Sequence, residues 1–329
     1  RIRFLTRCNV RVYSQSPYMD ELKNCAEMRV GDFRIAVTTE VGPRVIGCFI
    51  GDDDNMFAVL PKKYYNNRCK FKLYGGHRLW HSPEDFPRCY EGDNDPVTVT
   101  ELETGLEFSN PAEPNTGIRK KIMIEPLPNG MFIVTHTLTN CNMWPIELAP
   151  WALSVMAPGG MAVIPQYRDE EGDPYKPDRN LQLWPYCSYA DSRLKMGDKY
   201  FFLKQDSKNK KSFKLGTNNM AGWIAYVRNG KAFVKYFDVM DECEGDYPDN
   251  GCSTEAFTNN EFCEIETLGV LETLEPGDST QHVEYWQGIS GLPEIKNEAD
   301  FDKYVLPHIL QPEESSCDCE DEDCDCHQH

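Results

Sequence analysis

The segment Phe33-Arg34-Ile35-Ala36-Val37 decides the fold class of this chain. Its large apolar side chains stand at alternating positions, a period that places them on one face of a β-strand. Gly42-Pro43 then interrupts the run, and residues 45–50 resume it. Because Gly and Pro mark turns, the sequence predicts two strands joined by a turn.

The same alternation recurs along most of the chain. Further strands are predicted at 120–125, 131–138, 146–155, 200–203, 222–227, 232–237, 262–268 and 281–287. Asn229-Gly230 stands between two of them and predicts a tight hairpin. A short helix is expected at 298–305, ended by Pro307. Many closely spaced strands with so little helix predict an all-β protein, a sandwich or a barrel.

The 329 residues contain no linker that divides them clearly, so one main domain is expected. Residues 1–24 are interpreted as an N-terminal extension, within which Met19 is a candidate natural start. Residues 25–311 form the single β-sandwich domain. Residues 312–329 are an acidic, Cys-rich tail that is expected to be disordered. Within the domain, 161–193 is expected to be a polar loop, a place where binding residues often lie.

Charge and hydropathy exclude several partners. The net charge is −19, and the chain remains acidic without the eight acidic residues of 313–329. Nonspecific nucleic-acid binding needs the opposite sign, whereas a neutral sugar is compatible with this charge. The sequence contains no run of 18 apolar residues, so no membrane span is predicted. No leader is recognised, so a cytoplasmic location is expected.

Cysteine is abundant, with 14 residues, of which ten lie in the body and four in the tail. The body set has no Cys-x-x-Cys pair, and without a leader free thiols are expected rather than a disulfide framework. In the tail, two Cys-x-Cys pairs and two histidines offer ligands to a soft metal. The alternative is a solvated acidic segment, and neither is connected with the main activity.

Residues 75–85 are the densest group of chemically reactive side chains. They read Gly-Gly-His-Arg-Leu-Trp-His-Ser-Pro-Glu-Asp. His77 and His81 are four positions apart, which puts them on one side of a strand or of a helical turn. They are either hydrogen-bonded histidines of a turn or part of a site. Arg78 stands where a zinc protease motif has its Glu, so neither a metal nor another cofactor is expected.

Two later segments also carry paired polar groups. In a strand, Glu264 and Glu266 share one face with the apolar Phe262 and Leu268, which favours a partly enclosed carboxylate that can act as a base. A solvated strand face is the alternative. In 281–287, His282, Glu284 and Trp286 share a face, which is either a site or an outward polar surface.

Several motifs, taken in chain order, resemble a known family. They are VTTEVGPR at 37–44, GGHRLWH at 75–81, LTN at 138–140, APW at 149–151, GCSTE at 251–255, EIETLG at 264–269 and LEPGD at 274–278. Together they resemble a bacterial branch of the galactose mutarotase-like (aldose 1-epimerase) superfamily, over roughly 25–288. The resemblance implies a large antiparallel β-sandwich, the supersandwich, with a sugar site on the concave face of one sheet.

The resemblance also implies roles for particular residues. Glu266 corresponds to the general base, and His77 or His81 is the candidate acid. Arg78, Trp80, Trp151, Glu255 and Glu264 are candidate substrate-binding residues. The family has a histidine on the strand after the Thr-x-Asn segment, but here 149–152 reads Ala-Pro-Trp-Ala, with no histidine.

The expected ligand is a small-molecule sugar or an oligosaccharide. Three functions are compatible with such a ligand. The first is an isomerase of the aldose 1-epimerase type, which interconverts sugar anomers by acid–base catalysis without a cofactor. The second is a noncatalytic carbohydrate-binding or sensing module, because fold does not fix function. The third is a carbohydrate hydrolase or lyase that uses Glu264 and Glu266 as a pair.

Overall fold

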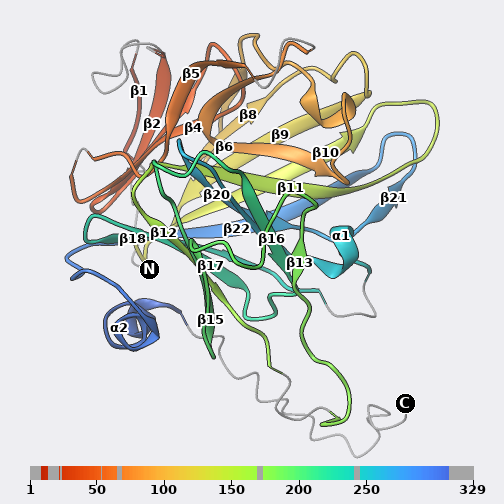
Figure 1. Ribbon diagram of the computed structural model, residues 1–329. Helices are drawn as coiled ribbons and strands as arrows, with labels where there is room; N and C mark the ends of the chain where they lie inside the picture. The colour runs from red at the N-terminus through yellow and green to blue at the C-terminus, as the bar shows by residue number, and fades with distance from the viewer. Residues whose placement is uncertain are drawn as a thin grey trace, which may run out of the picture.

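The computed structural model describes residues 9–13, 22, 24–52, 54–64, 69–168, 173–240 and 245–310. In this part of the chain the strands form two large antiparallel sheets that pack face to face, so the fold is an all-β sandwich (Figure 1). This confirms the fold class that the alternating sequence and the resemblance predict.

The first sheet has 12 strands. Along its main path these are β1 (Asn9–Tyr13), β2 (Cys25–Val30), β3 (Phe33–Thr38), β4 (Val45–Ile50), β6 (Lys72–Ser82), β11 (Ile146–Met156), β20 (Cys263–Leu268), β19 (Thr254–Thr258), β16 (Phe213–Thr217) and β13 (Gln182–Leu183). Two more strands join at the side, β5 (Val59–Tyr64) on β6 and β21 (Glu272–Leu274) on β11. β1 lies in the predicted N-terminal extension and pairs with β2.

The second sheet has ten strands. In order they are β14 (Leu194–Met196), β15 (Tyr200–Lys204), β12 (Met161–Pro165), β17 (Trp223–Arg228), β18 (Lys231–Phe237), β22 (Ser279–Ile289), β10 (Phe132–Asn140), β9 (Ile118–Pro126), β8 (Leu106–Ser109) and β7 (Thr98–Glu101). Every predicted strand is therefore present, and the strands that sequence analysis missed are mostly short or lie at sheet edges.

The main core lies between the sheets. Phe33, which opens the alternating segment, packs edge-to-face on Phe132 of the opposite sheet with ring centroids 5.2 Å apart. Deeper in the core, Phe57 packs in the same way on Phe233 and Trp286. Large apolar side chains of both inner faces thus fill the space between the layers, as two packed sheets require.

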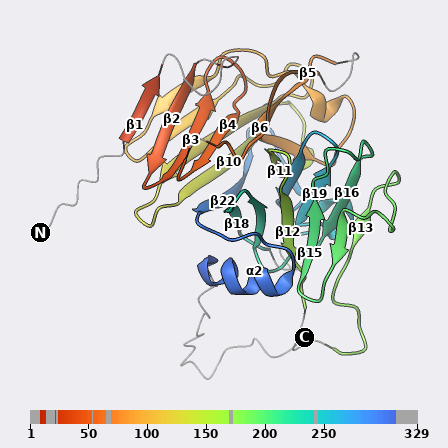
Figure 2. The same ribbon diagram turned by 60° about the vertical axis from the view of Figure 1, so that its left-hand side comes forward.

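The predicted hairpin and helix are confirmed. Asn229 and Gly230 have φ values of 50° and 72°, the left-handed pair that a tight two-residue hairpin turn needs. Helix α2 (Glu298–Tyr304) starts with the Asn297 side chain accepting from the backbone N–H of Asp300. Its Phe301 stacks on Trp223, so α2 covers the outer face of the second sheet (Figure 2). The other helical elements are α1 (Pro248–Gly251), η1 (Arg88–Tyr90) and η2 (Leu306–His308).

One expectation needs correction, and one pair of alternatives is decided. The predicted polar loop 161–193 begins with the largely buried strand β12, because Met161-Ala-Val-Ile-Pro is an apolar run that belongs to the second sheet. His282, Glu284 and Trp286 of β22 do not form an outward polar face, since all three are buried in the sandwich interior.

Some expectations concern residues outside the described ranges, including the tail 312–329, Cys8 and Cys243. The eight cysteines that the structure describes are free thiols. Within the same ranges, no helix has the length and apolar character needed to cross a membrane.

Candidate functional site

A cavity of about 750 Å³ lies on the face of the first sheet that points away from the core. Its floor comes from strands β6, β11, β20, β19 and β16, which are neighbours in that order. The lining residues are Lys63, Phe71, Leu73, Arg78, Trp80, Glu84, Tyr90, Trp151, Leu153, Trp184, Tyr186, Lys211, Ser212, Lys214, Phe257, Asn259, Phe262, Glu264 and Glu266.

Strand β20 supplies the acidic centre of this cavity. Its alternate residues Cys263 and Ile265 belong to the core between the sheets, so Glu264 and Glu266 project from the opposite face. Phe262 lines the cavity on the same side. The structure therefore places the two glutamates together in a partly enclosed cavity and not on a solvated strand face.

Glu266 is held by two neighbours from different strands. Its Oε2 accepts hydrogen bonds from Trp151 Nε1 at 2.9 Å and from Lys214 Nζ at 3.2 Å. Its Oε1 accepts none from the residues that the structure describes. Glu266 is almost fully buried. One oxygen of the carboxylate is therefore fixed, while the other remains able to accept a proton.

Lys214 on β16 links Glu266 to a second carboxylate. Its Nζ lies 2.6 Å from Glu255 Oε2 and sits over the rings of Trp151 and Trp184, 4.6 and 4.5 Å from their centroids. Burial would lower the pKa of Lys214, but attraction to the two glutamates outweighs burial and holds this pKa well above its ordinary value. Lys214 is therefore a permanent cation that is shared by two carboxylates.

Glu255 lies behind this cation and does not itself line the cavity. Its side chain is 0% exposed, and neither carboxylate oxygen has a well-directed hydrogen bond among the described residues, although the Lys214 ammonium is close. Burial raises the pKa of Glu255 well above its ordinary value, while Lys214 opposes the shift. Glu255 thus supports the charge balance of the site from beneath.

Glu264 has a different partner. Its Oε1 accepts a hydrogen bond from Arg78 Nη1 at 3.1 Å, and the Arg78 guanidinium lies 4.4 Å from the centroid of the Trp80 ring. Burial raises the pKa of Glu264, Arg78 opposes the rise, and repulsion from Glu266 adds to it. In the group as a whole, three buried carboxylates face two cations, so retention of one proton is favoured.

The walls of the cavity are strongly aromatic. The rings are those of Phe71, Trp80, Tyr90, Trp151, Trp184, Tyr186, Phe257 and Phe262. Trp80 packs edge-to-face against both Tyr90 and Trp151 with centroids 4.9 and 5.5 Å apart. Tyr186 remains 53% exposed at the opening. Such rings stack on the C–H faces of a sugar, while nearby carboxylates and amides bind its hydroxyls.

His77 and His81 do not share this cavity, which corrects the expectation that one of them faces Glu266. Successive side chains of a strand alternate, and on β6 it is Arg78 and Trp80 that point into the cavity. His77 projects between the sheets, and His81 Nε2 lies 3.6 Å from Glu113 Oε2. Among the described residues, no histidine lines the cavity.

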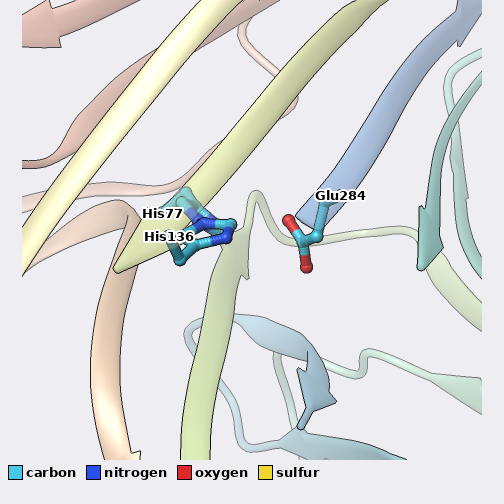
Figure 3. A group of neighbouring side chains, drawn as sticks. All are labelled: His77, His136 and Glu284. Atoms are coloured by element: carbon cyan, nitrogen blue, oxygen red, sulfur yellow. The ribbon is translucent and has the colours of Figure 1, made fainter. Parts of the chain in front are cut away.

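His77 instead belongs to a buried polar network (Figure 3). His136 Nδ1 lies 2.9 Å from the His282 carbonyl oxygen, which can only accept, so His136 Nε2 is the accepting nitrogen. His77 Nε2, 2.7 Å away, therefore donates to it, and His77 Nδ1 accepts from Ser154 Oγ at 2.9 Å. Each ring nitrogen of this histidine pair consequently has a hydrogen-bond partner.

Glu284 faces the two histidines from β22 in Figure 3, so the three side chains have the composition of a metal site. The geometry favours hydrogen bonding instead. Glu284 accepts from Lys235 Nζ at 2.6 Å and from Trp286 Nε1 at 2.7 Å. Two nitrogen ligands at about 2.0–2.1 Å from a tetrahedral zinc lie roughly 3.4 Å apart, well beyond the 2.7 Å observed here.

Burial keeps these histidines neutral. It lowers the pKa of His77 well below its ordinary value, with repulsion from His136 and Lys235 adding to the effect. The pKa of His282 falls to about 3 for the same main reason, although Glu284 opposes the shift. For Glu284, burial raises the pKa, but Lys235 and the histidines outweigh burial and lower it. The network thus contains one ion pair and neutral imidazoles.

Lys214, Trp184 and Tyr186 line the cavity but were not predicted as site residues. The alternation in Phe213-Lys214-Leu215 is the signal for β16, and it is too short to stand out. Trp184 and Tyr186 come from 161–193, the segment that was expected to carry binding residues. Of the eight predicted site residues, Glu266, Glu264, Arg78, Trp80 and Trp151 line the cavity.

The two packed antiparallel sheets have the fold of solved structures that are named galactose mutarotase-like. No protein-family model and no curated protein matches the chain. Among solved structures, a galactose mutarotase-like protein from Lactobacillus casei matches with a TM-score of 0.51 and 10% identity, over 81% of this chain and all of that one. A candidate aldose 1-epimerase from Klebsiella pneumoniae matches at 0.56 and 11%, over 86% and 83% of the two chains.

A TPR-domain containing protein from Parabacteroides distasonis is similar to the same extent. Its TM-score is 0.56 and its identity 11%, over 88% of this chain and 52% of that one. The Parabacteroides distasonis protein therefore carries a region of the same fold within a longer chain. At such identities the comparisons establish a shared fold. The Lactobacillus casei and Klebsiella pneumoniae proteins with this fold are named after enzymes that act on sugars.

Proposed function

We propose that this protein binds a sugar in the aromatic cavity and interconverts its anomers, with Glu266 as the general base. The observation that carries the proposal is the environment of Glu266. Its Oε2 is fixed by Trp151 and Lys214, its Oε1 accepts no hydrogen bond from the described residues, and the residue lines the cavity. A fixed carboxylate with one accepting oxygen is suited to remove a proton from a bound hydroxyl.

Glu264 is the group that we assign as the acid, in place of the two histidines. Burial raises its pKa, which favours the protonated form that a general acid needs. Two alternate residues of an antiparallel strand are separated by about 7 Å. The two oxygens on an anomeric carbon, each with a hydrogen bond of about 2.7 Å, require a similar span.

The reaction needs no group from outside the site. Glu266 takes the proton from the anomeric hydroxyl, the electron pair of that O–H bond forms the carbonyl, and the bond from the anomeric carbon to the ring oxygen breaks. Glu264 gives its proton to the ring oxygen. The aldehyde rotates, the ring hydroxyl attacks its other face, and both protons return. Each positioned group contributes roughly 10²- to 10⁴-fold.

Binding without catalysis is the second candidate, and the absence of a histidine from the described cavity wall favours it. Arg78 and Lys214 neutralise much of the acidic pair, which suits a site that only recognises hydroxyls. The aromatic walls serve both functions equally.

The experiment is a thermal-shift screen of monosaccharides and disaccharides, followed by exchange NMR on the sugars that bind. A ligand that binds only the folded protein raises its melting temperature. Catalysis predicts saturation transfer between the two anomeric proton signals, above the rate of the sugar alone. Binding without such transfer supports the second candidate, and no thermal shift with any sugar contradicts both.

A further inference from the structure

The cavity floor is longer than one sugar needs. Glu264 and Glu266 line it from β20 and Phe262 from the position just before that strand, and the four residue steps from Phe262 to Glu266 cover about 13 Å of extended chain. Across the sheet, the path from Arg78 on β6 to Lys214 on β16 crosses four strand spacings, about 19 Å. A pyranose ring built from bonds of about 1.5 Å spans only about 6 Å between opposite hydroxyl oxygens.

The two ends of the floor differ in chemistry. Glu266, Trp151 and Lys214 form the charged inner end. Towards the other end, Phe262 stands two positions before Glu264, and Phe257, the cross-strand neighbour of Glu264 and Lys214, packs beside it with ring centroids 5.8 Å apart. The two rings extend the floor as an apolar surface from Glu264 towards the Asn259 turn, and the proposed chemistry does not use them.

Polar groups border the same aromatic pair. Asn259 Oδ1 accepts from the backbone N–H groups of Glu261 and Phe262, which directs the side chain and leaves its NH₂ group without a partner among the described residues. Phe213 pairs with Thr258, so Ser212 and Lys211 stand beside the Asn259 turn. Within the described part of the chain, no hydrogen bond or ion pair occupies the side chains of Ser212 and Lys211.

From this arrangement we infer that Phe257, Phe262, Asn259 and Ser212 form an outer sugar subsite, and that the ligand is a disaccharide or a longer oligosaccharide. This inference rests on the proposed function, because the inner sugar is the one that meets Glu264 and Glu266. The outer sugar places its C–H face on the Phe257–Phe262 pair, and its hydroxyls bind Asn259 and the exposed side chains at the rim.

Calorimetric titration with matched sugars tests the subsite. D-glucose and D-galactose are compared with maltose, lactose and melibiose on the wild-type protein and on Ser212→Trp, which fills the outer end from an exposed position. Lys195→Trp adds the same indole to an exposed position on β14, outside the cavity lining, and is the matched control. Ser212→Ala removes the hydroxyl without filling the space.

The wild type is expected to bind at least one disaccharide tenfold or more tightly than its constituent monosaccharides. Ser212→Trp should abolish this preference for the disaccharide and leave the monosaccharide affinity unchanged. Lys195→Trp should keep the preference and the monosaccharide affinity. Ser212→Ala should keep most of the preference. Equal affinities for single and double sugars in the wild type, or equal loss of both in Ser212→Trp, would overturn the subsite while leaving the proposed function in place. Failure of all five sugars to bind would instead remove the proposed function, and the subsite with it.

Discussion

Replacing Lys214 by Met should destabilise the protein strongly and in a pH-dependent way. Met keeps much of the aliphatic stem but removes the ammonium that Glu255 and Glu266 share. Removing one partner of a buried ion pair costs about 3–5 kcal/mol, because the remaining charge is left uncompensated. At about 2 °C per kcal/mol, the expected loss at pH 8 is about 6–10 °C in melting temperature.

The pH dependence follows from Glu255. Its pKa in the folded protein is already raised by burial, with Lys214 opposing the rise, so loss of Lys214 raises it further. A carboxyl whose folded pKa exceeds its unfolded value stabilises the fold at low pH and loses that stabilisation as the pH rises towards the folded pKa. The penalty of Lys214→Met should therefore be smaller at pH 5 than at pH 8.

Urea unfolding at pH 5, 6.5 and 8 measures this penalty, with the exposed Lys195→Met as the control for loss of a surface charge. The double variant Lys214→Met with Glu255→Gln should recover part of the stability at pH 8, because it removes a buried charge that has lost its partner. A single variant as stable as wild type at pH 8, or a loss that grows as the pH falls, would refute the assignment of Lys214 as the shared cation.

Three further outcomes are expected. Deletion of 312–329 should leave the melting temperature and sugar affinity unchanged, because this segment has no large apolar side chain to dock, and a large loss in either would show that it contributes to the fold or site. Thiol titration of the unfolded protein, purified without reductant, should detect at least the eight free cysteines, and mostly bridged cysteines would contradict this. The unfolding free energy should fall as the pH drops from about 6.5 towards 3, since buried neutral histidines take up protons only on unfolding. His77→Gln should weaken this dependence of the unfolding free energy on pH, and an unchanged dependence would exclude His77 from the effect.

The fold was predictable because its signals are local. Alternation in 33–37 and 146–155 identifies strands whose one face must be buried, and Asn229-Gly230 identifies a turn from backbone conformation alone. Short segments such as β16 carry a weaker local signal. In β16 only Phe213 and Leu215 alternate as large apolar residues before Gly216 ends the pattern.

The site was predictable only in part, for a reason that β6 makes plain. Strand period says that His77 and Arg78 point to opposite faces, but it does not say which face carries the cavity. That choice depends on the second sheet, which packs on the histidine side. Lys214 was beyond prediction for a related reason, since it reaches Glu266 from a strand two places away in the sheet and no sequence pattern marks such a partner.

The most direct test of the role of Glu266 is the anomer exchange rate of Glu266→Gln, measured by saturation-transfer NMR on a sugar that binds the wild type. Gln keeps the shape of the side chain and removes its basicity, and the exposed Glu103→Gln is the matched control outside the cavity. We expect Glu266→Gln to bind the sugar nearly as well as wild type and to exchange its anomers about 100-fold more slowly or worse, with Glu103→Gln unchanged. Exchange at the wild-type rate in Glu266→Gln would contradict the assignment of the base, and binding without any exchange in the wild type would establish a sugar-binding protein that is not an epimerase.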